Sequence, residues 1–485
     1  MKRHLYLSTI LADVGEPLLF VSPLTCIPLV VAILFGEWKI LPSMASVPVI
    51  FLLLGLALKR LPKSGQEKRL SAAMCSVALF WLICAAVSGI PFVFGVHMSV
   101  TDSLFEGMAG WTSTAFSMAR DLDTMPFTLL FWRSYMQWIG GIAIVAFSIA
   151  MASSTGLFTT KMLRSESRDE PPMHGVITAG RALYGIYALL TFIAIGLILF
   201  TGLSLWDSVN LAMTTISTGG FTVHSQGIIY YQNILLELVL IPIMIAGALP
   251  FKLYFLILQN RKWSFFGDEQ VKLFFIILAA GVAFLTFDQV YFENTDVLIA
   301  LGQGLFMATS ALTTTGFQIA RPDAWAGVTL LFLTMLVFIG GSAGSTAGGI
   351  KLNRVALAYR GMLWWFKRAF VSAKVIVPLR IEGKVIPRAT AEIEMAKNML
   401  VIILSVVIVF ISTLLVLQFH ITSFSISEVL FDTISALSTC GLTTGYVSYD
   451  MPVLSKWIFI GMMWVGRLEV IPVMMLIIAL IRDPE

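Results

Sequence analysis

The chain has 485 residues, of which 58% are hydrophobic and 12% are charged, and its mean hydropathy is +0.88. A water-soluble globule cannot bury this much apolar surface, so the composition excludes that class and indicates a membrane protein. The formal net charge of +4 comes from short basic loops between apolar segments, which indicates orientation in a membrane and no partnership with nucleic acid.

Ten apolar segments come near the roughly 20 residues that a membrane-spanning helix needs. In chain order they are 18–35, 47–58, 70–94, 127–151, 183–200, 234–258, 273–287, 328–339, 400–417 and 457–481. No signal-peptide cleavage pattern follows the first segment, so we expect it to be retained. The four cysteines lack metal-ligand spacing and give no information on disulfides.

Basic residues fill alternate loops, at 59–69, 161–181, 261–272 and 351–397. The intervening loops hold only Lys39, Arg120, Arg321 and Lys456. Because cytoplasmic loops carry the excess of lysine and arginine, this alternation predicts a multi-pass protein of the cytoplasmic (inner) membrane with both termini in the cytoplasm.

Four short polar motifs interrupt the apolar segments and align without a gap. They read TSTAFS, STGGFT, TTTGFQ and STCGLT, and their fourth residues are Ala115, Gly220, Gly316 and Gly441. Thirteen residues earlier stand Asp102, Asp207, Gln303 and Glu428, and 25 to 27 residues later stand Gly141, Gly247, Gly341 and Gly466. The repetition predicts four units, each made of a helix, a re-entrant half-helix, a polar loop and a second helix.

A half-helix of about 12 residues is too short to cross a bilayer, so it must enter and turn back. Non-helical backbone at membrane depth survives only inside protein or beside a watery cavity. The four loops are therefore expected to meet around one axis and to line a pore. Glycines let successive carbonyls face one side, and a ring of such carbonyls can replace the hydration shell of a monovalent cation.

These features resemble the Trk/Ktr/HKT superfamily of potassium transporters, whose members carry four helix, pore-loop, helix repeats in one chain. The resemblance covers residues 70–481, and the two leading spans look like those of the Trk branch. It implies an all-α polytopic fold divided into 1–68, 69–165, 166–265, 266–390 and 391–485. It also implies potassium as the transported ion, without an organic cofactor. The implied filter residues are Thr112, Ser113, Thr114, Ala115, Thr218, Gly219, Gly220, Thr314, Thr315, Gly316, Thr439, Cys440 and Gly441.

One quadrant departs from the family pattern, because Ala115 stands where glycine is usual. If that position needs a positive φ, alanine costs on the order of 1 kcal/mol or more, and its methyl group can tilt one carbonyl out of the ring. Passage of sodium as well as potassium is therefore open, as is a cation-coupled secondary transporter of the same fold. Inverted repeats would suit such a transporter, whereas all four motifs fall on the same predicted side of the membrane.

The stretch GGSAGSTAGGIK interrupts the second helix of the third repeat and resembles the family's intramembrane gating loop. Its gate residues would be Gly340, Gly341, Ser342, Gly344, Ser345, Gly348 and Gly349. In the fourth repeat Arg467 matches an arginine that protrudes into the pore near that loop, although structural pairing is an alternative. Glu469, two residues on, points to another helix face and is a poor partner for Arg467.

Several residues have ordinary explanations. The acids at 102, 207 and 428 more simply complement helix N-termini than concentrate cations, and the helix glycines more simply allow close packing than act as hinges. Arg133 is expected to extend to the membrane interface. The histidines show no metal-binding spacing, and no motif of a membrane enzyme is present in the sequence. The resemblance also implies a homodimer surrounded by lipid and a cytoplasmic nucleotide-binding regulatory subunit, for which the basic segment 351–397 is a candidate docking surface.

Overall fold

The computed structural model describes residues 2–63, 70–155, 172–260, 267–372, 377, 379–381, 384–386, 388–419 and 423–481. Helices dominate these residues, as predicted, and the described strands are the short antiparallel pair β1 (Leu379–Ile381) and β2 (Lys384–Ile386). Most of the predicted basic loop at 161–181 lies outside the described residues, as do the predicted repeat boundaries after residues 68, 165 and 265. The boundary after residue 390 lies near the start of α16 (Arg388–Phe419).

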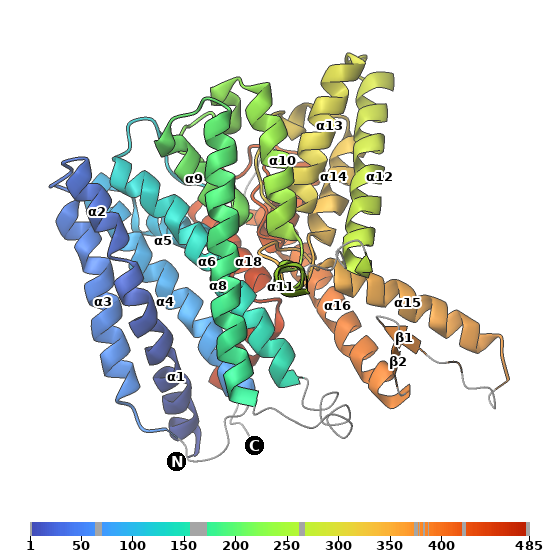
Figure 1. The fold of residues 1–485 in the computed structure, drawn as a ribbon, viewed down its shortest axis with the longest axis horizontal. Helices are drawn as coiled ribbons and strands as arrows, with labels where there is room; N and C mark the ends of the chain where they lie inside the picture. The colour runs from blue at the N-terminus through green and yellow to red at the C-terminus, as the bar shows by residue number, and fades with distance from the viewer. Residues whose placement is uncertain are drawn as a thin grey trace.

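An N-terminal hairpin precedes the repeats and forms one edge of the molecule (Figure 1). It consists of α1 (Lys2–Leu24), α2 (Ile27–Leu34) and α3 (Leu41–Lys59). Its helices approach closely, because a Cβ on Gly15 would lie 2.8 Å from the carbonyl oxygen of Gly55. The first predicted span, 18–35, was placed too late: the helix begins at Lys2, includes the charged Asp13, and breaks before Ile27. Asp13 is accommodated because its carboxylate accepts a 2.8 Å hydrogen bond from Lys63.

Each repeat has the predicted order of helix, half-helix, loop and second helix. Repeat 1 contains α4 (Leu70–Val96), α5 (Val100–Trp111) and α6 (Phe127–Thr155), and repeat 2 contains α8 (Pro172–Phe200), α9 (Leu205–Ile216), the 3-10 turn η1 (Gly227–Tyr231), α10 (Ile234–Ala248) and α11 (Phe251–Asn260). Repeat 3 contains α12 (Glu269–Tyr291), α13 (Val297–Leu312), the turn η3 (Pro322–Ala324), α14 (Gly327–Ile339) and α15 (Leu352–Ala369). Repeat 4 contains α16, α17 (Ile426–Leu437), α18 (Val453–Arg467) and α19 (Ile471–Ile481).

The half-helices α5, α9 and α17 each have 12 residues and start in the same way. A serine, at 99, 204 or 425, caps each one by accepting a hydrogen bond from the backbone N–H of the acid three residues later. The acids Asp102, Asp207 and Glu428 therefore complement the N-terminal ends, and Glu428 completes a capping box. Their carboxylates also favour the positive end of the helix dipole.

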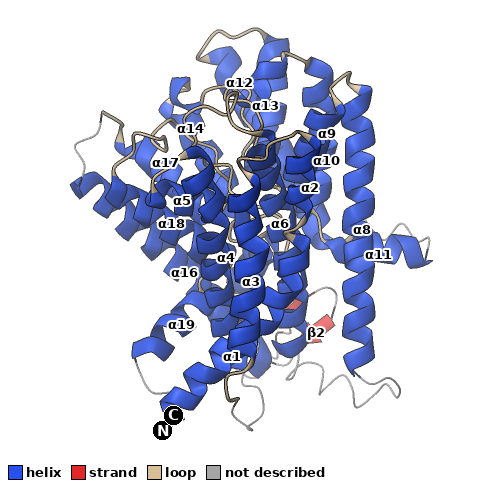
Figure 2. Cartoon of the chain, turned by 90° about the vertical axis from the view of Figure 1, so that its left-hand side faces the viewer, coloured by secondary structure: helices blue, strands red, loops and turns tan. Residues whose placement is uncertain are grey.

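The second helix is broken in three of the four repeats. The predicted spans 234–258 and 457–481 are each bent, and the glycine-rich stretch interrupts the second helix of the third repeat as predicted. Six helices among the described residues are long and apolar enough to cross a membrane, and the bent pairs α10/α11 and α18/α19 raise this number to eight. The bends are 94° and 112°. Figure 2 shows α11 running across the direction of α8. Pro250 causes the first bend, and positive φ values at Glu469 and Val470 mark the second.

Glycines in the second helices allow the half-helices to pack against them. A Cβ on Gly247 would lie 2.6 Å from the carbonyl oxygen of Ile216, the last residue of α9. Gly140 and Gly466 make the same approach to the last carbonyls of α5 and α17. The sequence alignment matched Gly141 with Gly247 and Gly466, but the structural equivalent is its neighbour Gly140. Gly141 itself lies against Ser217 of the next repeat. Close packing explains these glycines directly.

The described ends of the chain lie together. The start of α1 and the end of α19 are at the same end of the molecule in both views (Figures 1 and 2). α15 and the β1/β2 hairpin project from the side opposite the N-terminal hairpin. The loops that follow the half-helices gather in the other half of the molecule, between the helices (Figure 2).

Candidate functional site

The four polar motifs share one backbone conformation at their second residue. Ser113, Thr218, Thr314 and Thr439 have φ values of 52°, 50°, 53° and 48°, in the left-handed region. Each follows the end of its half-helix and is at most 1% exposed. A serine or threonine rarely adopts this conformation, so its fourfold occurrence points to a shared structural requirement.

The fourth residues of the motifs bring the loops into contact. Gly220, Gly316 and Gly441 have φ values of 72°, 85° and 90°. A Cβ on any of them would lie between 2.5 and 2.9 Å from the Cβ of Ala115. The Ala115 methyl group therefore occupies the point on which the three glycines converge, and the loops meet around one axis. Main-chain oxygens also come close, because Gly220 faces the carbonyl of Thr315.

Gln137 of α6, which the sequence motifs did not predict as a site residue, connects the first two loops. Its side-chain Nε2 donates to the carbonyl oxygens of Thr114 at 3.1 Å and Gly219 at 2.8 Å. Its Oε1 accepts a 3.0 Å hydrogen bond from the backbone N–H of Phe221. Gln137 is fully buried. A buried glutamine in an apolar segment 22 residues after Ala115 was the available signal.

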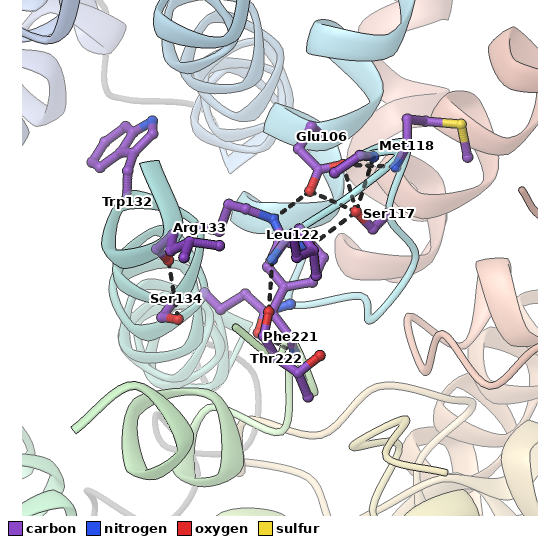
Figure 3. Close-up of polar contacts among 12 residues, drawn as sticks. Glu106, Ser117, Met118, Leu122, Trp132, Arg133, Ser134, Phe221 and Thr222 are labelled. Carbon is purple, nitrogen blue, oxygen red and sulfur yellow. Dashed lines mark hydrogen bonds and ion pairs between the residues drawn. The ribbon is translucent and has the colours of Figure 1, made fainter. Parts of the chain in front are cut away.

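A buried ion pair supports the first loop from behind (Figure 3). Arg133 Nε lies 2.6 Å from Glu106 Oε1, and both side chains are at most 1% exposed. Arg133 also donates to the Thr222 carbonyl of the second loop at 2.8 Å, and its guanidinium lies 4.0 Å from the centre of the Phe221 ring. The prediction that Arg133 extends to the membrane interface was wrong, because Glu106 on α5 and the Thr222 carbonyl hold it in the protein interior.

The fourth loop has an equivalent acid without the arginine. Asp432 of α17 accepts hydrogen bonds from Thr443 Oγ1 at 2.6 Å and from the backbone N–H groups of Thr444 and Val447 at 2.8 and 3.1 Å. Glu106 likewise accepts from the hydroxyl of Ser117 and the N–H of Met118. The position corresponding to Arg133 is Phe459 in repeat 4. The donors to Asp432 are thus neutral, which leaves its negative charge directed at the loop.

The glycine-rich stretch lies against the half-helix end of the converging loops. Gly348 N–H donates to Thr314 Oγ1 at 2.7 Å, and Gly349 N–H donates to the Ser438 carbonyl at 3.1 Å. The Thr346 hydroxyl contacts Thr218 Oγ1 at 3.3 Å. Gly340, Gly344 and Gly349 have φ values of 70°, 74° and 78°, which side chains other than glycine rarely adopt. The remaining predicted gate residues, Gly341, Ser342 and Ser345, belong to the same buried or half-buried turn.

Arg467 of α18 joins this layer. It is 3% exposed and donates to the Thr346 carbonyl at 2.9 Å, the Gly140 carbonyl at 3.1 Å and Ser113 Oγ at 3.2 Å. All three acceptors are neutral oxygens. Within the described residues the Arg467 Nε has no hydrogen-bond partner. The positive charge therefore lies beside Ser113, the second residue of the first motif, and none of these three acceptors carries a counter-charge.

Glu469 turns away from Arg467 to the end of the glycine-rich stretch. It forms ion pairs with Lys351 Nζ at 3.5 Å and with Arg354. Lys351 has a φ of 77° and a side chain that is 4% exposed. The break between α18 and α19 is thereby bonded to the residue where the stretch ends.

On the opposite side of the loops a cavity of about 410 Å³ opens outward. Ala115 and the three glycines line its floor, and Arg120 and Arg321 contribute to its wall. Lys456, predicted as a loop residue, is instead 6% exposed and pairs with Asp102 at 2.6 Å, so neither group gathers cations at this mouth. No cluster of three or more His, Cys, Asp or Glu that could hold a metal ion occurs among the described residues.

Comparisons with known proteins agree with this architecture. The family model described as "TrkH: Cation transport protein" matches residues 43–484. An uncharacterized cation transporter of Methanocaldococcus jannaschii is 30% identical over 96% of this chain and 94% of its own length. The Trk system potassium uptake protein TrkH of Halomonas elongata is 27% identical over 97% and 98%. The crystal structure of the potassium transporter TrkH from Vibrio parahaemolyticus superposes with a TM-score of 0.85, at 23% identity, over 97% of this chain and 98% of that one.

Proposed function

Because this chain belongs to the TrkH family of cation transport proteins, we propose that it carries potassium ions across the cytoplasmic membrane, inward, through the four converging loops. The observation that supports this most directly is the left-handed conformation at Ser113, Thr218, Thr314 and Thr439. Four such turns around one axis are what a ring of main-chain oxygens around a dehydrated cation requires. The filter consists of the residues predicted from the sequence, from Thr112–Ala115 to Thr439–Gly441.

Charge supports the choice of a monovalent cation. The C-terminal ends of the half-helices carry partial negative charge and point at the filter, and the Asp432 carboxylate adds negative charge behind the fourth loop. A divalent ion would instead require direct carboxylate ligands. The membrane potential supplies the driving force, about 2.3 kcal/mol per charge for each 100 mV.

The gate comprises the glycine-rich stretch and Arg467. In the described conformation Gly348 and Thr346 bond to filter hydroxyls, and the Arg467 guanidinium lies beside Ser113. A cation that leaves the filter on this side meets the backbone of the glycine-rich stretch and the positive charge of Arg467. Opening requires Thr346–Gly349 to withdraw and Arg467 to exchange its contacts with Thr346 and Ser113.

The chain works as a homodimer with a cytoplasmic nucleotide-binding subunit, as its resemblance to the Trk branch implies. The basic segment 351–397, which includes α15, is the docking surface for that subunit. Both termini then face the cytoplasm, on the same side as the gate.

Flux measurements on the purified chain in liposomes test the proposal. We expect potassium uptake under a potassium gradient with no proton gradient. Gly316→Ala is expected to abolish it, because a Cβ there overlaps the Cys440 carbonyl and φ is 85°. Gly461→Ala, on α18 with no atom within 4 Å of the added Cβ, is the matched control. Sodium uptake of equal size would favour the second candidate, a sodium-permeable transporter, which Ala115 motivates. Absence of uptake of either ion would refute both.

A further inference from the structure

One peptide unit of the filter is turned over relative to its counterparts. In repeats 3 and 4 the carbonyl of the third motif residue faces the glycine of the preceding loop: Thr315 faces Gly220, and Cys440 faces Gly316. Around the ring, the carbonyl of Thr114 would be expected to face Gly441. Gly441 instead faces the backbone nitrogen, Cα and Cβ of Ala115. The peptide between Thr114 and Ala115 thus presents its N–H where the corresponding peptides of repeats 3 and 4 present oxygen.

Both ends of this turned peptide are bonded. The Ala115 N–H donates to the Cys440 carbonyl oxygen at 3.2 Å, inside the ring. The Thr114 carbonyl, on the far side, accepts the 3.1 Å hydrogen bond from Gln137 Nε2. The Cys440 oxygen, a predicted ion ligand, is consequently engaged by a protein donor.

The hydrogen bonds of the Gln137 side chain all go to the backbone of the first two filter loops. Its two amide hydrogens serve the carbonyls of Thr114 and Gly219, and its oxygen serves Phe221. In repeats 3 and 4 the residues at the same distance from the fourth motif position are Phe338 and Met463, which cannot donate a side-chain hydrogen bond to a carbonyl. Repeat 1 combines the alanine and the glutamine.

Ala115 and Gln137 favour the same orientation of the Thr114–Ala115 peptide. Among the described residues, positive φ at the fourth motif position is confined to Gly220, Gly316 and Gly441. Alanine is strained in that region, so Ala115 resists the rotation that would bring the Thr114 carbonyl into the ring. The hydrogen bond from Gln137 opposes the same rotation.

We propose that Gln137 is a positioning residue that keeps the Thr114–Ala115 peptide turned over and thereby lowers the preference of the filter for potassium over sodium. This inference rests on the proposed function. A potassium-selective ring depends on the number and strength of its carbonyl dipoles, and an N–H group directs the wrong end of its dipole at the ion. Rotation of the peptide restores one carbonyl from Thr114 and releases that of Cys440.

The test compares potassium and sodium fluxes of the full chain in liposomes. Gln137→Met removes the donor and keeps the length, and Gln137→Glu places an oxygen against the carbonyls of Thr114 and Gly219. Each is expected to raise the potassium-to-sodium flux ratio by roughly fivefold, which corresponds to the net free energy of one ordinary hydrogen bond. Ala115→Gly is expected to raise it as well, and Ala115→Gly combined with Gln137→Met to give less than the product of the two changes, since both act on one peptide.

Ser134→Ala is the control, since Ser134 is buried in the same helix and donates at 3.3 Å to Leu130. Its flux ratio is expected to match that of the unaltered chain. A merely structural role for Gln137 would reduce both fluxes together and leave the ratio unchanged, and that result in a folded variant overturns the inference. If both Gln137 variants unfold, an unchanged ratio in Ala115→Gly overturns it. These outcomes leave the proposed function standing when the unaltered chain carries potassium, whereas no cation flux in the unaltered chain refutes the proposed function itself.

Discussion

Glu469, in the break between α18 and α19, lies 3.5 Å from Lys351, the residue that ends the glycine-rich stretch. Both residues have positive φ, at 61° and 77°. Strained backbone persists only where surrounding contacts hold it, and it concentrates at sites that move. The ion pair thus connects the backbone of the proposed gate to the second helix of repeat 4.

Glu469→Gln is expected to increase potassium flux in the absence of any regulatory subunit. The substitution removes the charge that holds Lys351 and Arg354, so the glycine-rich stretch withdraws from the filter more often. A hydrogen bond to a charged group contributes about 1.5 to 3 kcal/mol, so the increase is expected to be on the order of tenfold or more. Liposome flux measures it.

Glu394→Gln provides the control for this change. Glu394 also pairs with a lysine, Lys397, at 3.2 Å, but both side chains are about half exposed. The potassium flux of the Glu394→Gln variant is expected to equal that of the unaltered chain. Lower flux in a folded Glu469→Gln variant would mean that the ion pair supports conduction and does not restrain it.

Gly466→Ala is expected to destabilise repeat 4. The added Cβ would overlap the carbonyl of Leu437 at the end of α17. The nearest atoms are all backbone atoms of Leu437, which cannot move aside as the end of a flexible side chain could. Overpacking of this kind costs about 1 to 3 kcal/mol. Thermal unfolding in detergent measures the change. Gly461→Ala in the same helix has open space around it and is expected to raise the unfolding temperature slightly, since alanine favours helix. Equal effects at 461 and 466 would contradict the packing role.

The filter loops could be predicted because their requirements are local. The chain turn at the end of each half-helix has a recognisable sequence pattern: Ser/Thr-x-x-Gly in three repeats and the closely similar Thr112–Ala115 in the first. The contact between Gly466 and Leu437 could also be anticipated, because a small residue recurs at nearly the same offset in each repeat. Fold class and loop convergence follow from this periodicity.

The side chains that support the filter could not be predicted in this way. Gln137 and Arg133 each bond to two repeats, and their partners depend on how neighbouring repeats meet, which no local pattern records. An isolated arginine near a helix end is compatible with an interfacial position until Glu106 is placed beside it. The bend at Glu469 and Val470 could not be predicted from the sequence either, because neither residue is typical of a turn.

Breaking the buried pair between Glu106 and Arg133 is expected to destabilise the chain strongly. Arg133→Met leaves the Glu106 carboxylate buried with only Ser117 and Met118 as donors. Removal of one partner of a buried ion pair typically costs about 3 to 5 kcal/mol, whereas removal of both costs less. The double variant Glu106→Gln/Arg133→Met is therefore expected to unfold at a higher temperature than Arg133→Met. Arg321→Met, at an exposed pair with Asp323, is expected to change little.

Acid is expected to weaken the connection between the first two loops at Asp123. The hydrogen bond from His224 at 2.8 Å lowers the pKa of the Asp123 carboxyl from its ordinary value of 3.8. A carboxyl with a lowered pKa stabilises the fold above its ordinary pKa, and that contribution disappears as the pH falls through the lowered value. Asp123→Asn is therefore expected to unfold at a lower temperature than the unaltered chain at pH 5 and at the same temperature below a pH of about 3. Because the Asp123 side chain is 46% exposed, solvent screening keeps the difference in unfolding temperature small.

Asp450→Asn, at an exposed loop position of repeat 4, is the control for this prediction. If the effect of Asp123→Asn on the unfolding temperature persisted unchanged at the lowest pH, the ionised carboxylate would be excluded as its source.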